Sequence, residues 1–133
     1  MLNIKRVDVR KEIHEENSIY IGRYNKAYNL SPSPLANPFI IGKDGSREEV
    51  VEKYQQWLWV NVKRKLDNSS DAKQDNSVFT ELKRLQLKAR KIQVTDSTNG
   101  YLTLMCWCKE NKKCHGDIII NCLNWMETNH IGD

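Results

Sequence analysis

Apolar residues recur along the chain with two different spacings, and each spacing predicts a different kind of element. Residues 4–9 alternate in part between apolar and charged side chains, which predicts a half-buried strand. Residues 18–23 form a second, more apolar strand candidate. Residues 101–107 carry apolar side chains on both faces, as the central strand of a sheet requires. The pattern therefore predicts three strands.

Three amphipathic segments predict helices. The first follows Ser46, which forms a capping box with Glu49, and its apolar positions are 50/51, 54, 57/58, 62 and 66. The second has a stripe at 82, 85, 89 and 92 with Ser77 as its cap, and residues 91–95 either extend it or form a short strand. The third covers 115–127, with apolar positions at 118, 119, 122, 123 and 126.

Two connecting segments differ in character. Residues 24–45 hold all three prolines together with Leu35, Phe39, Ile40 and Ile41, which predicts a long but ordered loop. Residues 67–76 are polar and predict a flexible, dispensable linker, and residues 96–100 predict a turn.

The predicted order of elements is β-β-α-α-β-α. Strands that are connected through helices favour an α/β fold: one small domain over residues 1–133, with a central, mostly parallel sheet flanked by helices. The pattern leaves the order of the strands open.

Composition narrows the function classes. The net charge of +4 is mild and no long basic run occurs, so nucleic acid is not indicated as a partner. No apolar run is long enough to span a membrane. The N-terminal residues carry charge where a signal peptide needs an apolar stretch, so we expect a cytoplasmic protein with reduced cysteines. A homo-oligomer stays open.

Three cysteines and a histidine gather at the junction between the last predicted strand and the last helix. Cys106, Cys108, Cys114 and His115 lie within ten residues, where open α/β folds place ligands. The spacing lacks the paired signature of a zinc site, and neighbouring Cys114 and His115 would not easily bind one ion. We therefore expect no metal. If zinc binds, its ligands are Cys106, Cys108 and Cys114.

Two residues of this cluster, Cys114 and His115, can also be interpreted as a catalytic pair. Cys114 lies at the predicted helix N-terminus, where backbone amides favour the thiolate, and His115 can act as a base. The alternative is that Cys114 and Gly116 only make a tight turn. Cys106 and Cys122 are more simply interpreted as small buried core residues.

Polar residues upstream suggest a site for an anion. Arg23 follows a strand, Asn37-Pro38-Phe39 follows a proline-rich stretch, and Lys43 and Arg47 flank the helix that Ser46 caps. Exposed amides at such a helix start suit a phosphate or carboxylate. A plain turn and cap is the alternative, since both glycine fingerprints of nucleotide sites are missing.

Taken in order, these motifs resemble a known family. They are Tyr20-Ile-Gly-Arg23, Ser33-Pro-Leu-Ala-Asn-Pro-Phe39, Ile41-Gly-Lys-Asp-Gly-Ser-Arg-Glu-Glu-Val-Val51, Cys106-Trp-Cys108 and Cys114-His-Gly116. The chain resembles the domain of unknown function 4326 family of bacteria and their phages over about residues 18–126. The resemblance implies no activity. It marks as motif positions Arg23, Asn37, Pro38, Phe39, Gly45, Arg47, Cys106, Cys108, Cys114 and His115.

Together these observations favour a pocket for a small anionic, nucleotide-like ligand. Its expected catalytic residues are Cys114 and His115, and its expected ligand-binding residues are Arg23, Asn37, Phe39, Lys43, Ser46 and Arg47. Whether the pocket only holds the ligand, or hydrolyses or transfers a group, stays open. The alternatives are a zinc-stabilised domain that binds nucleic acid and a protein-interaction module, such as a phage inhibitor of a host factor.

Overall fold

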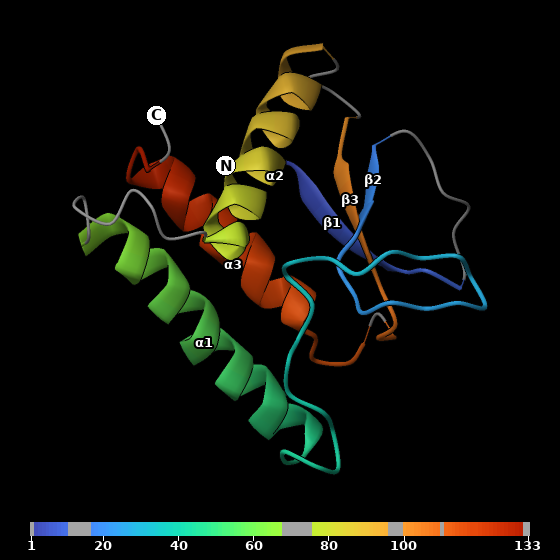
Figure 1. Ribbon diagram of the computed structural model, residues 1–133. Coiled ribbons are helices and arrows are strands. Elements are labelled where there is room, and N and C mark those ends of the chain that lie inside the picture. The colour runs from blue at the N-terminus through green and yellow to red at the C-terminus, as the bar shows by residue number, and fades with distance from the viewer. Residues whose placement is uncertain (1, 11–16, 68–75, 96–99, 110, 132–133) are drawn as a thin grey trace.

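In the part of the chain that the structure describes, the fold is a small α/β arrangement of three strands and three helices (Figure 1). The computed structural model describes residues 2–10, 17–67, 76–95, 100–109 and 111–131. The elements in chain order are β1 (Ile4–Asp8), β2 (Ser18–Tyr20), α1 (Arg47–Asp67), α2 (Ser77–Thr95), β3 (Leu102–Cys106) and α3 (His115–Thr128). This order confirms the predicted one, and residues 91–95 extend the second helix.

The sheet is parallel, and β3 lies at its centre as predicted. The strand order is β1-β3-β2, and every residue of β3 is buried. In the register, Asp8 pairs with Cys106 and Tyr20 pairs with Met105. The carboxyl ends of all three strands therefore meet at one edge of the sheet, the edge at which open α/β folds bind ligands.

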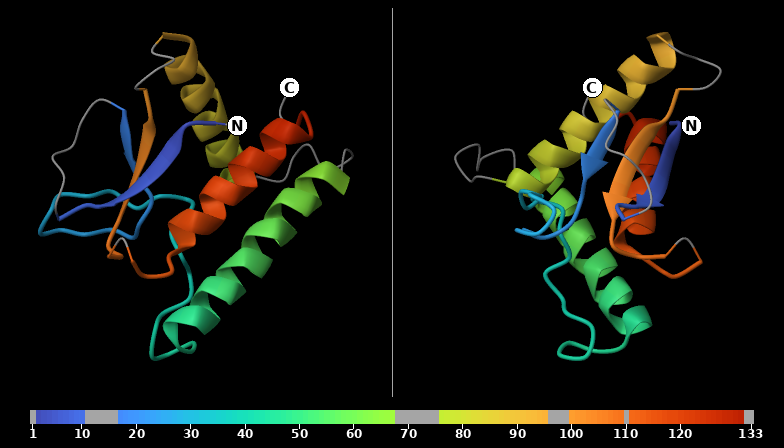
Figure 2. Two further views of the ribbon diagram at one scale, coloured as in Figure 1. Left: turned by 180° about the vertical axis from the view of Figure 1, so that it is seen from behind. Right: turned by 90° about the vertical axis from the view of Figure 1, so that its right-hand side faces the viewer.

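The described helices lie on one face of the sheet, as the views in Figures 1 and 2 show. The main apolar core joins Leu102 and Leu104 of β3 to the apolar stripes of α1, α2 and α3. The opposite face carries a smaller cluster in which Leu30, from the long loop, packs with Val7 and Met105. The long loop therefore takes the place that a helix layer occupies in a larger α/β sheet.

The predicted cap of α1 is confirmed. The Ser46 Oγ accepts a hydrogen bond from the Glu49 N–H at 3.3 Å, and the Glu49 Oε1 accepts one from the Ser46 N–H at 3.1 Å. Together they form a capping box. Gly45 precedes it with a φ of +138°, a conformation that strains any residue with a Cβ.

The predicted cap of α2 is wrong by one residue. Ser77 is the first residue of the helix, and the Asn76 Oδ1 accepts a hydrogen bond from the Phe79 N–H at 2.9 Å. Asparagine caps helices at least as well as serine, and here it occupies the position from which its oxygen reaches the third helical amide.

The third helix begins directly after Cys114, whose side chain caps it. Its buried positions include Ile119, Cys122, Leu123 and Met126, as predicted, while Ile118 is half-buried. The interiors of the predicted linker 67–76 and turn 96–100 lie outside the described residues. Among the residues that the structure describes, no helix has the length and apolarity needed to cross a membrane.

Candidate functional site

A pocket of about 510 Å³ opens at the carboxyl edge of the sheet. Its walls come from the ends of β2 and β3, the long loop, the first turn of α1 and the segment that leads into α3. The lining residues are Tyr20, Gly22, Arg23, Tyr24, Asn25, Asn37, Phe39, Ile40, Ile41, Arg47, Val50, Val51, Trp107, Cys108, Lys113, Cys114 and His115.

Most of the residues that the sequence singled out meet in this pocket. Those that line it are Arg23, Asn37, Phe39, Arg47, Cys114 and His115. Lys43 and Ser46 are not among the lining residues. Lys43 is exposed on the turn before α1, and the Ser46 hydroxyl is engaged in the capping box. The expectation that the capped helix start faces the same pocket therefore holds for Arg47 alone.

Arg23 shapes one wall of the pocket by holding the long loop. Its Nη2 donates hydrogen bonds to the backbone oxygens of Asn37 and Phe39 at 2.6 and 2.7 Å. The Asn37 Oδ1 in turn accepts a hydrogen bond from the Phe39 N–H at 2.9 Å. The sequence predicted that Asn37 would orient a ligand, and the structure uses this side-chain oxygen to fold the loop.

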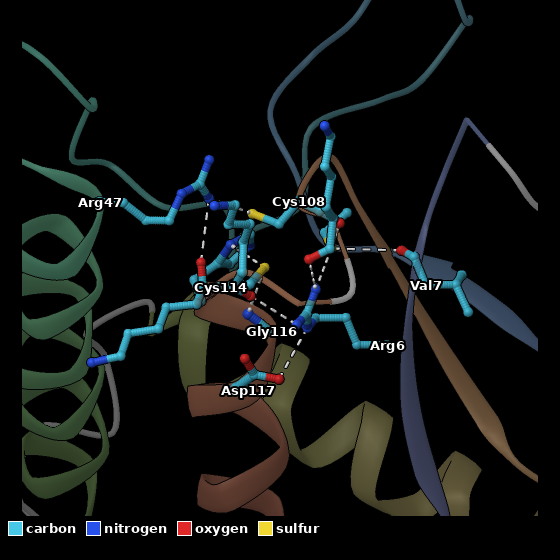
Figure 3. A network of polar contacts seen from close by, with 12 residues as sticks. Arg6, Val7, Arg47, Cys108, Cys114, Gly116 and Asp117 are labelled. Atoms are coloured by element: carbon cyan, nitrogen blue, oxygen red, sulfur yellow. Dashed lines mark hydrogen bonds and ion pairs between the residues drawn. The ribbon is translucent and has the colours of Figure 1, made fainter.

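Arg47 connects the start of α1 to the segment before α3. Its Nη1 lies 3.3 Å from the backbone oxygen of Lys113 and 3.4 Å from the Cys108 Sγ (Figure 3). With Arg23 and Lys113, it gives the pocket three cationic side chains from three separate segments. None of the described lining residues is acidic, so the lining favours an anion.

Aromatic rings form another part of the lining. Tyr20, Tyr24, Phe39 and Trp107 contribute, and Tyr24 is 65% exposed. The Tyr20 hydroxyl donates to the backbone oxygen of Arg23 and accepts from the Trp107 Nε1, both at 2.6 Å. Gly22 is needed beside this ring, because a Cβ there would lie 2.4 Å from the Tyr20 hydroxyl oxygen.

His115 lies at the base of the pocket in a fixed orientation. Its Nε2 is 2.8 Å from the backbone oxygen of Ile21, which can only accept, so Nε2 carries the proton of the neutral ring. Burial lowers the pKa of His115 and favours this neutral form. Its Nδ1 then keeps a lone pair and lies 3.7 Å from the Cys114 Sγ.

The three clustered cysteines come together in space. The sulfur atoms of Cys106, Cys108 and Cys114 all lie within 4.8 Å of one another. They come from the last residue of β3, the segment just after it and the residue that caps α3. All four cysteines of the chain are unpaired, and Cys122 is buried in the apolar core as the simpler interpretation predicted.

The sulfur atoms share protons unequally. Hydrogen bonds from Cys106 and Cys114, together with the Arg47 guanidinium, hold the pKa of Cys108 well below its usual value. Hydrogen bonds with Cys106 and Cys108 raise the pKa of Cys114. The reactive thiol predicted from the sequence is Cys114, which stays a prediction, but the electrostatics favour a thiolate at Cys108.

Arg6 is not among the residues that the sequence pattern singled out. Its side chain is only 8% exposed and donates to the Asp117 carboxylate at 3.0 Å and to the backbone oxygens of Lys109 and Lys112 at 3.2 and 3.0 Å. Burial opposes its charge, yet the hydrogen bond to Asp117 and the nearby sulfur atoms raise the pKa of Arg6.

The position of Arg6 has a signal in the sequence. Ile4 and Arg6 have the same parity in β1, so they point to one face of the sheet, and that face packs against the helices. Gly116 makes room for the arginine, because a Cβ at Gly116 would lie 2.8 Å from the Arg6 Cδ.

Comparisons with known proteins support the family and leave the activity open. Neither the curated proteins nor the solved structures contain a match to the chain. The family model described as domain of unknown function DUF4326 matches residues 3–125, which is most of the chain. The chain therefore belongs to the DUF4326 family.

Proposed function

We propose that the protein binds a small anionic, nucleotide-like ligand in the pocket at the carboxyl edge of the sheet. One observation carries this proposal: three cations from separate segments, Arg23, Arg47 and Lys113, line one pocket whose described lining residues include no acidic side chain. Such a lining attracts a phosphate or carboxylate. The volume of about 510 Å³ is within the usual range for a small-molecule site.

The remaining lining residues suit the rest of a nucleotide. A guanidinium has five N–H donors, so the two bonds from the Arg23 Nη2 hold it in place without exhausting it. The exposed ring of Tyr24 and the half-buried rings of Phe39 and Trp107 offer faces on which a base can stack. If the ligand is also processed and no metal is bound by the cysteines, His115 and Cys114 are the groups that we assign to hydrolysis or group transfer.

Binding of AMP, ADP and ADP-ribose, measured by isothermal titration calorimetry, tests this proposal. Arg23→Gln and Arg47→Gln should each weaken the tightest of these ligands at least tenfold, which corresponds to about 1.4 kcal/mol. Lys43→Gln is the matched control, because Lys43 is a nearby exposed cation that does not line the pocket. Melting temperatures verify that each variant is folded.

Two outcomes contradict the proposal. If none of the three nucleotides binds, the pocket does not serve this class of ligand. If Lys43→Gln weakens binding as much as Arg23→Gln does, the anion is held at the start of α1 and outside the pocket.

Zinc binding is the second candidate, and the mutual approach of the three cysteine sulfur atoms within 4.8 Å supports it. Four unpaired cysteines also suit a reducing compartment, and we propose the cytoplasm. The nucleic-acid partner and the protein-interaction module considered from the sequence have no comparable support among the described residues.

A further inference from the structure

We infer that the cysteine triad, Cys106, Cys108 and Cys114, is a zinc centre whose fourth coordination position faces the pocket. The metal would then be part of the ligand site and not only a structural staple. The identity of the group that occupies the fourth position rests on the proposed function, whereas the metal centre itself rests on the geometry of the triad.

The spacing of the sulfur atoms suits a single ion. Zinc–sulfur bonds of about 2.3 Å in tetrahedral geometry place the ligand sulfur atoms roughly 3.8 Å apart. The three sulfur atoms already lie within 4.8 Å of one another, so small side-chain movements complete the geometry. In a [2Fe–2S] or [4Fe–4S] cluster, three cysteines cannot all bind the same iron atom, so at least two of them lie farther apart than around a single ion. Three thiolates are soft ligands, which favours zinc over magnesium or calcium.

Each sulfur atom also has an N–H donor from outside the triad. The Arg6 Nη1 lies 3.9 Å from the Cys106 Sγ, the Arg47 Nη1 lies 3.4 Å from the Cys108 Sγ, and the Gly116 N lies 3.4 Å from the Cys114 Sγ. Figure 3 shows Arg6 and Arg47 approaching the cluster from β1 and α1. A neutral thiol is a weak acceptor, so this arrangement is matched to thiolates.

Three thiolates at this distance repel one another unless a cation lies between them. A bound zinc ion removes that repulsion, and hydrogen bonds to ligand sulfur atoms are a usual second layer of support around a metal. The Cys106 Sγ lies 3.5 Å from the backbone oxygen of Val7, a weak bond that zinc binding would replace.

The locations of the three cysteines determine the direction in which the fourth coordination position points. Cys106 and Cys114 are both buried and Cys108 is half-buried, but only Cys108 and Cys114 line the pocket. Among the described residues, no histidine nitrogen or carboxylate oxygen joins the group within 4.8 Å. His115 is held by the Ile21 backbone oxygen through its Nε2, and its Nδ1 lies 3.7 Å from the Cys114 Sγ. Three protein ligands with one open position is the arrangement of zinc sites that bind substrate.

Charge makes this centre suitable for an anion. Zinc with three thiolates carries a net charge of −1. Arg6 is paired with Asp117, so Arg47 offsets the charge of the centre. Arg23 and Lys113, which line the same pocket, then attract an oxygen of a phosphate or carboxylate to the open position.

Metal binding is tested first on the whole protein. The purified chain should bind one zinc or cobalt ion, and cobalt should give the visible absorption of a tetrahedral thiolate site. Cys106→Ala, Cys108→Ala and Cys114→Ala should each weaken cobalt binding at least tenfold. Cys122→Ala is the matched control, because Cys122 is a buried cysteine of α3 that lies outside the triad, and it should bind cobalt as the wild type does. Of the three ligand variants, Cys108→Ala should disturb folding least, because Cys108 is only half-buried.

The open position is tested by adding azide to the cobalt protein. The visible spectrum of the wild type should shift, because azide enters the free coordination position. A spectrum that responds to azide only after His115→Ala would show that His115 fills the position, and it would overturn the inference. Absence of stoichiometric metal binding, or loss of metal in Cys122→Ala, would overturn the site itself.

Failure of this inference and failure of the proposed function give different results. If the metal centre is wrong, AMP or its relatives still bind the metal-free protein, and that binding depends on Arg23. If the nucleotide proposal is wrong, the cobalt protein still responds to azide while no nucleotide binds.

Discussion

The core beneath the helices and the carboxyl edge of the sheet are held together by different forces. The core is apolar: side chains such as Leu58, Leu82, Leu104 and Leu123 are fully buried among α1, α2, α3 and β3. The edge is built from segments without regular structure. Side chains hold these segments in place by donating hydrogen bonds to their backbone oxygens. These pairs are Arg6 with Lys109 and Lys112, Arg10 with Trp107, Arg23 with Asn37 and Phe39, Arg47 with Lys113, Tyr54 with Leu35, and His115 with Ile21.

The difference shows how a small domain can carry a charged pocket. Apolar burial is non-directional and stabilises the body, while hydrogen bonds to backbone oxygens fix the shape of the loops. Arg23 and Arg47 have two roles. Their guanidinium groups hold the loops by hydrogen bonds, and they also supply positive charge to the pocket. We therefore expect core substitutions to change stability alone, and edge substitutions to change stability and binding together.

Leu123→Ala should produce the largest loss of stability. Leu123 is fully buried in the apolar core, and truncating such a leucine costs about 2–5 kcal/mol of unfolding free energy. Chemical denaturation measures the loss. Cobalt binding per folded molecule should stay as in the wild type. The matched control is Leu87→Ala on α2, where the side chain is 49% exposed and the expected change is within about 0.5 kcal/mol.

Arg6→Met should have the next largest effect on stability. Unlike the core substitution, it should also weaken metal binding at the edge of the sheet. Methionine retains an apolar stem but loses the hydrogen bonds to the exposed oxygens of Lys109 and Lys112, each of which contributes about 0.5–1.5 kcal/mol. The ion pair with half-exposed Asp117 adds little. Cobalt affinity should fall as well, because Arg6 also faces the Cys106 sulfur.

Arg84→Met is the control for Arg6. Arg84 pairs with Glu81 on the exposed face of α2, and such a pair contributes little to stability. Equal losses of stability in the two variants would show that the contacts of Arg6 with the edge segments are worth no more than a surface ion pair.

The difference between the apolar core and the edge of the sheet also explains which features could be predicted from the sequence. Apolar periodicity predicted the strands and helices of the described residues, because burial in the core selects residues by spacing. The convergence of Arg23, Arg47 and His115 followed from the rule that parallel strands open at one edge. The roles of Arg6 and Asn37 did not follow, because they depend on which backbone oxygens come within reach. Asn76 in place of Ser77 was missed because either residue can cap a helix.

Ser46→Ala should have a smaller effect that stays outside the pocket. The lost hydrogen bond to the Glu49 N–H should cost about 0.5–2 kcal/mol of unfolding free energy. Because Ser46 does not line the pocket, AMP affinity and the cobalt spectrum should be unchanged. A fall in affinity with unchanged stability would instead place the ligand on the helix amides, as the sequence analysis suggested.

Glu49 should give the smallest effect, visible only through its dependence on pH. Its hydrogen bonds with the backbone and side chain of Ser46 lower the pKa of Glu49 from 4.5, and nearby Lys53 acts in the same direction. A carboxylate whose pKa is lower in the folded state stabilises the fold above the unfolded-state pKa, and that contribution is lost as the pH falls through the folded-state pKa. The wild type should therefore be more stable than Glu49→Gln near neutral pH, and the gap should close below about pH 4.5. Glu48→Gln changes an exposed carboxylate of the same turn and should keep the pH response of the wild type. A difference in stability of constant size at every pH would mean that the shape of the Glu49 side chain matters and its charge does not. The end of α1 nearest the pocket would then be fixed by packing, as the core is.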